Sequence, residues 1–182
     1  MPRPPLAREK VLDAFQTILI EEGERAATLD ATAKAAGVSK GGLLYHFASK
    51  DELVAGLLER LDALAADDLD LMTAAQNGPV DYYIRNSLLE DSAFDRALIA
   101  AARIAQGGDL DASAALRSIR ESWADCLRPH VHDDAALDLV MLIGDGLYYN
   151  NVLDAVQGGL AGPTPRGAQL EQLIALALRA SR

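Results

Sequence analysis

The chain has 182 residues, of which half are hydrophobic and only 5% aromatic, and its formal net charge is −10. This composition excludes a largely disordered protein, because Leu, Ala, Val and Ile are abundant enough to form a buried core. The single cysteine, Cys126, excludes an intramolecular disulfide and a thiolate metal cluster. The sequence shows neither a signal peptide nor an apolar run of membrane-spanning length, so we expect a soluble, cytoplasmic protein.

The acidic charge is unevenly distributed along the chain. Residues 61–182 hold nine Arg and no Lys against 18 acidic residues, whereas residues 1–60 hold eight bases against nine acids. Within residues 25–50 the balance reverses, because four bases face one acid, Asp30. A locally basic segment on an acidic body is typical of a protein that binds a polyanion with one face, although so small a cluster can also arise by chance.

Helical periodicity runs through the whole chain, and we predict an all-α fold of about nine helices. The first helix is expected over about residues 6–22, with Gly23 as its end. A second, short helix starts at Thr28, a good N-cap residue, and ends at Gly37. A third short helix is expected over about residues 40–46.

The fourth helix opens with a capping box in which Ser49 and Glu52 would satisfy each other's backbone donors, and it extends over about residues 50–76. The tripeptide Asn77-Gly78-Pro79 then breaks the helical pattern. Further helices are expected near residues 80–90, 93–106, 111–128, 134–156 and from 165 onward.

Two helix starts in the second half are predicted from capping chemistry. Asp134 would cap the long apolar helix that reaches residue 156. Thr164 would cap the last helix, with Pro165 at its first position, where proline is preferred. The glycines and prolines of residues 158–163 are expected to form the loop between these two helices.

Residues 28–46 have the form of a helix-turn-helix. A helix of about eight residues, a glycine-containing turn and a second short helix follow one another. Gly37 can adopt a positive φ at the corner, and Val38 can fill the space between the two helices. Ser39 can cap the second helix and touch a phosphate. The shape alone is moderately specific, because short helical corners are common in all-α proteins.

The sixteen residues from Val38 to Leu53, VSKGGLLYHFASKDEL, are more specific. This stretch closely resembles the recognition-helix signature of the TetR (tetracycline-repressor) family, and the resemblance covers about residues 8–58. It implies a helix-turn-helix DNA-binding domain over residues 1–50, a connecting helix at about 50–76, and an effector-binding and dimerisation domain over 51–182. Residues 60–182 vary freely in that family, so the resemblance does not define their chemistry.

The resemblance also implies roles for individual residues. Five side chains would bind DNA phosphates: Thr28, Ser39, Tyr45, His46 and Lys50. Three positions would face the edges of the bases: Lys40, Gly42 and Leu44. Gly41 would let the helix backbone come close to the DNA. Leu43 and Phe47 would hold the recognition helix on the core. A hydroxyl, an imidazole and an ammonium near one helix end are suitable phosphate donors.

Three positions depart from the family pattern. Thr32 stands where Ile or Val is usual, so its hydroxyl needs a hydrogen-bond partner in the core. Leu44 replaces a frequent second tyrosine, and Gly42 replaces a frequent threonine. Base recognition would therefore depend on few side chains, with a contact between Leu44 and a thymine methyl as one option.

The predicted helix at 134–156 is apolar on two faces, which indicates a core behind it and a second surface in front. In the TetR family the last two helices of each chain form a four-helix dimer interface. The resemblance therefore implies a homodimer with these contacts: Met141, Gly144, Tyr148, Leu170, Leu173, Ile174 and Ala177. The alternative is the central helix of a monomeric bundle.

Four residues are candidates for contact with a small-molecule effector: Arg103, Trp123, Asp145 and Tyr149. A carboxylate within an apolar helix is costly to bury without a partner. Asp145 could instead form a structural ion pair with an arginine such as Arg103, Arg117 or Arg120. Trp123 could belong to the core rather than to a binding pocket.

The sequence predicts no enzyme, because it has no nucleophile–base pair, phosphate-binding glycine loop or metal-ligand set. His130 and His132 flank Val131 beside two aspartates, but no further ligand cluster accompanies them, so we expect no metal and no cofactor.

The resemblance therefore implies a ligand-responsive DNA-binding regulator, a repressor released from a palindromic operator by an effector. Two alternatives remain at this point. One is a small all-α enzyme or carrier with an incidental helix-turn-helix. The other is a structural DNA protein without ligand control, which the acidic body disfavours because an architectural protein would spread positive charge.

Overall fold

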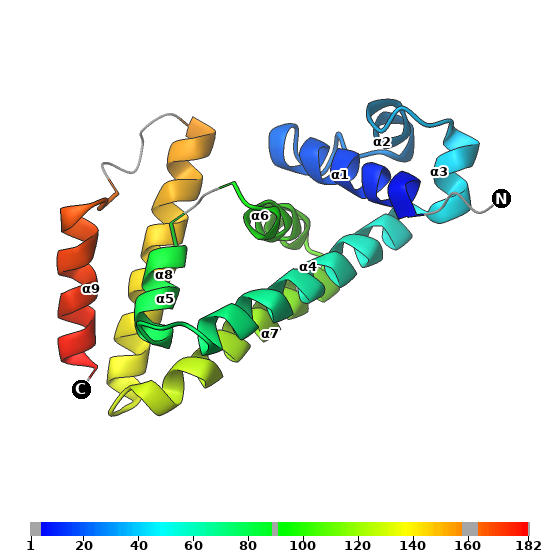
Figure 1. The fold of residues 1–182 in the computed structure, drawn as a ribbon. Helices are drawn as coiled ribbons and strands as arrows, with labels where there is room; N and C mark the ends of the chain where they lie inside the picture. The colour runs from blue at the N-terminus through cyan, green and yellow to red at the C-terminus, as the bar shows by residue number, and fades with distance from the viewer. Residues whose placement is uncertain (1–4, 89–90, 158–163, 182) are drawn as a thin grey trace. The chain divides into compact units, whose positions relative to one another are not determined.

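The computed structural model describes residues 5–88, 91–157 and 164–181, and within them the fold is entirely helical, as predicted (Figure 1). The helices are α1 (Pro5–Glu21), α2 (Leu29–Ala35), α3 (Lys40–His46), α4 (Lys50–Thr73), α5 (Pro79–Asn86), α6 (Ala93–Gln106), α7 (Leu110–Leu127), the short 3-10 helix η1 (Arg128–His130), α8 (Asp134–Gln157) and α9 (Ala168–Ala180). None of the helices in these ranges is long and apolar enough to cross a membrane.

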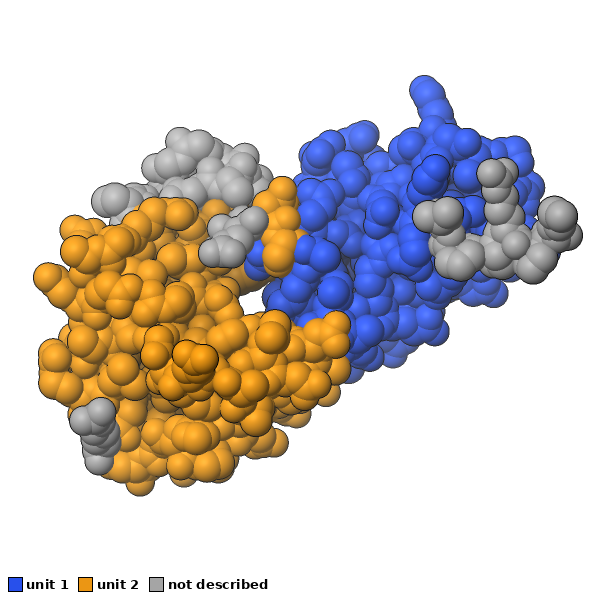
Figure 2. Space-filling view, in the orientation of Figure 1, with its two compact units in different colours: residues 1–64, 93–117 blue, residues 65–92, 118–182 orange. Residues whose placement is uncertain are grey.

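The chain forms two compact units, which Figure 2 shows in different colours. The first unit comprises residues 1–64 and 93–117, and the second comprises residues 65–92 and 118–182. Along the chain, α4 and α7 each begin in the first unit and end in the second. The predicted division at residue 50 between a DNA-binding and an effector-binding domain is a functional one, and it stays a prediction.

The core of the first unit joins α1, α2, α3 and α4 with the inner side of α6. Phe15 and Leu19 of α1, Leu43 of α3 and Leu57 of α4 are completely buried in it, together with Ile104 of α6. Burial of one such side chain stabilises the fold by about 1.5–3 kcal/mol. The three N-terminal helices are therefore anchored to α4 and α6 by a common apolar core.

The second unit has a separate core between α5, α8 and α9 and the ends of α4 and α7. Met72, Ile84, Leu127, Met141 and Ile174 are buried there. Within this core α5 lies against α8 and against α9 (Figure 1).

As predicted, α1 ends just before Gly23 and residues 77 and 78 separate α4 from α5, but Pro79 belongs to α5 as its first residue rather than to the break. The capping box at α4 is only half formed. Ser49 Oγ accepts the N–H of Glu52 at 3.1 Å, but the Glu52 carboxylate accepts from Ala48 N–H at 2.7 Å, one residue earlier than expected. Glu52 thus secures the turn between α3 and α4 rather than the N-cap itself.

Two predicted helix starts were wrong. Asp133, not Asp134, caps α8, because its carboxylate accepts the N–H of Ala136 at 2.8 Å. The last helix begins at Ala168 after Gly167, which has φ +53°, and not at Thr164 and Pro165. The predicted loop at 158–163 lies outside the described residues.

Candidate nucleic-acid interface

The α2–turn–α3 segment is a helix-turn-helix whose corner is set by local chemistry. Gly37 has φ +67°, a conformation that side chains disfavour, and Val38 N–H bonds back to Ala33 O at 3.0 Å. Thr28 and Ser39 cap α2 and α3, since their hydroxyl oxygens accept the N–H groups of Ala31 and Gly42 at 3.2 and 3.0 Å. The hydroxyl hydrogen of each cap is left as a donor, which is what a phosphate oxygen requires.

The two sides of α3 have different surroundings. Leu43 and the following Phe47 are buried in the core of the first unit, as predicted for both. On the opposite side Tyr45 is 84% exposed and Leu44 38% exposed. The rings of Tyr45 and the half-buried His46 lie edge to face, with centroids 5.1 Å apart. The helix therefore presents an aromatic hydroxyl and a short apolar side chain to the outside.

Glycines make the first turn of α3 bare. Gly41 and Gly42 are exposed, and a Cβ built on Gly41 would meet nothing within 4 Å. A Cβ on Gly42 would come 3.2 Å from Ser39 Oγ, a tight but local contact. No neighbouring side chain covers these two residues closely, so another molecule can approach the helix backbone there.

Both lysines predicted to contact DNA are paired with carboxylates of the chain itself. Lys40 Nζ lies 3.0 Å from an Asp30 carboxylate oxygen at an exposed position. Lys50 Nζ donates to the Glu24 carboxylate and to the Glu24 main-chain carbonyl, both at 3.2 Å, and is only half exposed. Two of the three ammonium hydrogens of Lys50 are therefore engaged within the chain.

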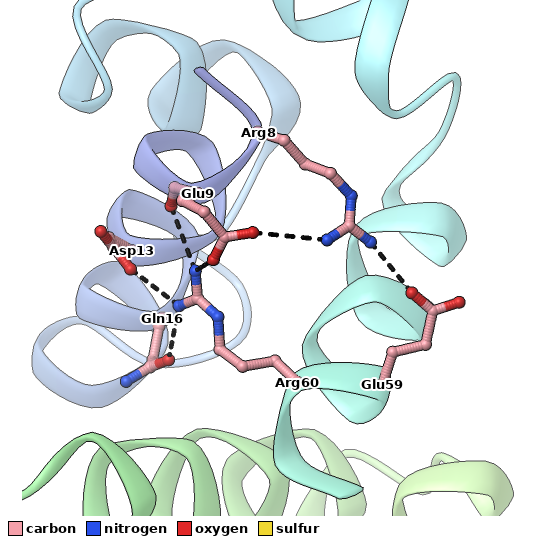
Figure 3. A network of polar contacts seen from close by, with 6 residues as sticks. All are labelled: Arg8, Glu9, Asp13, Gln16, Glu59 and Arg60. Carbon is pink, nitrogen blue, oxygen red and sulfur yellow. Dashed lines mark hydrogen bonds and ion pairs between the residues drawn. The ribbon is translucent and has the colours of Figure 1, made fainter. Parts of the chain in front are cut away.

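A ladder of charges fastens α1 to α4 (Figure 3). Arg60 of α4 is mostly buried and binds the carboxylates of Glu9 and Asp13, while Gln16 lies 3.4 Å away. Arg8 bridges back from α1 to Glu59, at 2.9 Å. Several charges held in one network fix helix orientation better than isolated surface pairs do.

Gly56 of α4 allows the end of α3 to pack beneath Arg8. A Cβ on Gly56 would lie 2.7 Å from Phe47 Cε1 and 3.3 Å from Arg8 Nη2. The Arg8 guanidinium carbon lies 5.2 Å from the Phe47 ring centroid, within the range of a cation–π contact. Sequence reasoning missed Arg8, Gly56 and Arg60. A glycine within a helix and an arginine one turn later do not show which other helix packs against them.

The comparison with protein-family models agrees with this geometry. Residues 11–57 match the model described as bacterial regulatory proteins, tetR family, which covers α2, α3 and most of α1. Residues 11–57 therefore form a domain of the TetR type. The match includes the whole helix-turn-helix, with the capped, glycine-rich α3, and the first turns of α4.

Solved structures of three other proteins resemble the whole chain in fold. SCO7518 of Streptomyces coelicolor A3(2), a proposed transcriptional regulator, is 19% identical, with a TM-score of 0.66 over 97% of this chain and 99% of its own. A transcriptional regulator of Rhodococcus sp. Rha1 is 21% identical, with a TM-score of 0.63 over 96% and 95%. Salmonella enterica GusR is 16% identical, with a TM-score of 0.64 over 100% and 98%. No curated protein matches the chain in sequence.

The second unit contains a cluster of polar and aromatic side chains. Tyr83 joins two of the predicted effector residues, since its ring lies 5.8 Å from that of Trp123 and its hydroxyl 3.5 Å from Asp145. Arg120 holds Asp145 at 2.8 Å, so the predicted structural ion pair exists and its partner is Arg120. Sequence reasoning missed Tyr83, which differs from its neighbour Tyr82 only in the face of α5 that it occupies.

Asp68 of α4 completes this cluster. It accepts hydrogen bonds from Trp123 Nε1 at 3.0 Å and from the Tyr82 hydroxyl at 2.9 Å. Burial and the nearby Asp68 carboxylate raise the pKa of Tyr82 to about 12, and burial followed by the charge of Asp145 raises the pKa of Tyr83 well above its usual range. Both phenols therefore remain protonated hydrogen-bond donors at neutral pH.

The other two predicted effector residues are placed differently. Tyr149 of α8 is 63% exposed, and Arg103 lies on α6 in the first unit. Neither has a described contact with Tyr83, Trp123 or Asp145. The structure thus brings together two of the four predicted residues. In the described residues no group of three or more His, Cys, Asp or Glu side chains has metal-binding geometry.

The predicted dimer contacts need correction, because most of them belong to the chain's own core. Four of the seven are buried: Met141, Leu170, Ile174 and Ala177. Gly144 is also buried, since a Cβ there would lie 2.3 Å from a Tyr83 ring carbon, so it serves packing against α5 within the chain. Leu173 packs partly on the same core, and Tyr148 is half-buried.

The residues of α8 and α9 that do face outward are different ones. Leu142 and Tyr149 of α8 are 64% and 63% exposed, Leu139 is 42% exposed, and Leu176 of α9 is 56% exposed. The two faces of α8 differ in their surroundings, since Met141 and Gly144, which were predicted to meet a partner, lie in the chain's own core, whereas Leu142 and Tyr149 are exposed. A residue-level dimer surface, if α8 and α9 form one, would consist of these exposed side chains.

Proposed function

We propose that the chain is a homodimeric transcription regulator that binds a palindromic DNA operator and leaves it when a small-molecule effector binds the second unit. The observation that carries the proposal is the capped, outward-facing α3 inside the family match at residues 11–57. Its predicted DNA contacts are Thr28, Ser39, Lys40, Gly41, Gly42, Leu44, Tyr45, His46 and Lys50.

The proposed division of labour on DNA follows from side-chain chemistry. The exposed Tyr45 hydroxyl and the two cap hydroxyls donate to phosphates, which position the protein without reading sequence. The bare first turn of α3 lets its backbone enter the major groove closely, and Leu44 supplies an apolar contact suited to a thymine methyl. Base discrimination then depends mainly on Lys40 and Leu44.

The effector is proposed to bind beside Tyr83, Trp123 and Asp145. These residues come from α5, α7 and α8, so a molecule inserted among them changes the packing of three helices at once. Through Asp68, the same cluster contacts α4, the helix that continues into the first unit. A ligand can shift DNA binding only if it binds the two states unequally, and typical coupling is about 1–3 kcal/mol.

Dimerisation is proposed through the outward residues of α8 and α9, Leu139, Leu142, Tyr149 and Leu176. A two-fold symmetric dimer carries two recognition helices, which must lie about one DNA turn apart, roughly 34–36 Å or a multiple of it. The inverted repeat expected in the operator follows from this symmetry.

The decisive experiment is a two-way titration. DNA fragments retained by the purified protein from its own genome supply the operator, and native mass spectrometry of the purified protein supplies any co-purifying small molecule. The ligand is then titrated against Trp123 fluorescence with and without operator. Linkage requires that operator weaken the ligand by the same factor, about 5–150-fold, as ligand weakens operator. Equal ligand affinity in both titrations would reduce the proposal to a plain DNA-binding protein.

A further inference from the structure

Glu24 lies at a junction of three elements in the first unit. Its main-chain carbonyl and its carboxylate Oε1 both accept from Lys50 Nζ at the start of α4. Its other carboxylate oxygen lies against Gly107, directly after the last residue of α6. A Cβ on Gly107 would come 1.8 Å from Glu24 Oε2. Only a residue without a side chain leaves room for the carboxylate there.

The charges at this junction depend on one another. The carbonyl end of a helix carries a partial negative charge, which disfavours a carboxylate nearby, although the carbonyls of Ile104 and Ala105 accept the N–H groups of Gly107 and Gly108. The ammonium of Lys50 offsets this repulsion, because it holds the Glu24 carboxylate at 3.2 Å with both side chains half-buried. Removal of Lys50 from Glu24 therefore leaves an uncompensated carboxylate against the end of α6.

We propose that Glu24 competes with DNA for Lys50, and that the end of α6 controls this competition through Gly107. The proposal rests on the DNA-binding function proposed above. A phosphate that engages Lys50 replaces the carboxylate, and Glu24 then moves away from α6. Conversely, a displacement of the end of α6 that expels Glu24 frees Lys50 for DNA, because one carboxylate contacts both groups.

The first test replaces Glu24 by glutamine and measures binding to a mixed-sequence DNA duplex about three helical turns long by fluorescence anisotropy. Glu24→Gln is expected to bind about fivefold more tightly than the wild type, the effect of losing an ion pair at a half-exposed site. The matched control is Glu22→Gln, which removes the same charge from an exposed position two residues away. The control is expected to change affinity by less than about twofold.

A double-mutant cycle separates two effects of Glu24: its competition with DNA for Lys50, and the general repulsion between its negative charge and the DNA phosphates. In a Lys50→Gln background the gain from Glu24→Gln should fall to that of Glu22→Gln, because no ammonium remains to be released. If Glu24→Gln proves too unstable to assay, Glu24→Asp keeps the charge but shortens the reach to Lys50, and it should show the same gain.

The second test concerns α6. Gly107→Ala places a methyl group where the Glu24 carboxylate lies, so it should raise DNA affinity about as much as Glu24→Gln, although it changes no charge. In a Glu24→Ala background the same substitution should have no effect. Unchanged or weaker DNA binding by a folded Gly107→Ala variant would overturn the role of α6.

The outcomes distinguish this inference from the proposed function. If the wild type binds the duplex and folded Glu24→Gln gains no more than Glu22→Gln, the competition is wrong and the DNA-binding function stands. If the wild type binds neither this duplex nor genomic fragments at low salt, the proposed function itself fails.

Discussion

The buried hydroxyl of Thr32 marks a departure of this chain from the TetR pattern at the scale of one residue. Thr32 is completely buried in α2, and its Oγ1 has no hydrogen-bond partner among the described residues. The sequence predicted the need for a partner, because the position falls on the core face of the helix. It could not predict that none is present, since the neighbours of that atom come from the packed helices rather than from adjacent sequence.

Thr32→Val should stabilise the protein. The substitution keeps the β-branched shape and removes a buried hydroxyl that lacks a partner, a defect that costs about 1–3 kcal/mol. We expect urea unfolding to show that the free energy of unfolding rises by about 1 kcal/mol, because imperfect packing of the new methyl group offsets part of the gain. The control is Thr28→Val, the same change at the α2 N-cap, which should cost about 1 kcal/mol because it removes the bond to Ala31 N–H.

Gly56→Ala should destabilise the first unit although alanine is the better helix former. The added methyl would meet the Phe47 ring at 2.7 Å, and overpacking of this kind costs about 1–3 kcal/mol. Gly41→Ala is the matched control in a helix with open space, where the same change should stabilise by about 0.5–1 kcal/mol. The measurement is the melting temperature of each variant relative to the wild type. A higher melting temperature for Gly56→Ala would contradict the close packing of α3 on α4.

At the scale of elements, the helices themselves were predictable and their mutual attachments were not. Periodicity and turn residues located α1 to α8 within a few residues, because these signals are local. The ladder between α1 and α4 depends on which faces meet, and Glu9, Asp13 and Arg60 each resemble ordinary surface charges in the sequence. The predicted start of α9 at Pro165 was wrong because Gly167 has a positive φ of +53°, which a helix cannot contain. The helix therefore begins after Gly167, at Ala168.

Arg60→Met should loosen the attachment of α1 to α4. The methionine can replace the buried stem of Arg60, but Glu9 and Asp13 would face each other without their cation. We expect a loss of about 1–2 kcal/mol in urea unfolding at low salt, and a smaller loss at high salt because the exposed carboxylates are screened. Glu59→Gln, at the outer end of the ladder, should cost less than half as much, and equal costs would show that the ladder does not act through Arg60.

At the scale of the whole molecule, the sequence predicted a doubly apolar α8 but not which face is internal. Both faces carry Leu, Gly and Tyr, so hydrophobicity alone cannot order them. The decision comes from α5, where Tyr83 occupies the space that Gly144 leaves open, and this contact turns Met141 inward and Leu142 outward. The bounds of α3, by contrast, were predicted from the sequence, because the residues that define this helix follow one another along the chain.

Leu142→Glu should convert the proposed dimer to a monomer. A carboxylate in the middle of an apolar interface would be desolvated without a partner, which should weaken association at least about tenfold. Sedimentation at micromolar concentration would show a species of 19.4 kDa instead of twice that mass. Leu71→Glu is the control, an equally exposed leucine of α4 in the same unit, and loss of the dimer in both variants would point to unfolding rather than to the interface.

The bare first turn of α3 has a consequence for how this protein can change over evolutionary time. Gly41 and Gly42 are helical and exposed. A Cβ on Gly41 would meet nothing within 4 Å, and one on Gly42 would meet only Ser39 Oγ and Val38 Cβ, so side chains can be introduced at either position without repacking the interior. A new side chain there adds helix propensity and at the same time adds a group that can distinguish base pairs. Substitutions at these two positions can therefore alter DNA preference without lowering the stability of the fold. A library randomised at these two positions alone should yield folded proteins with altered DNA preference at a far higher rate than a library at Leu43 and Phe47.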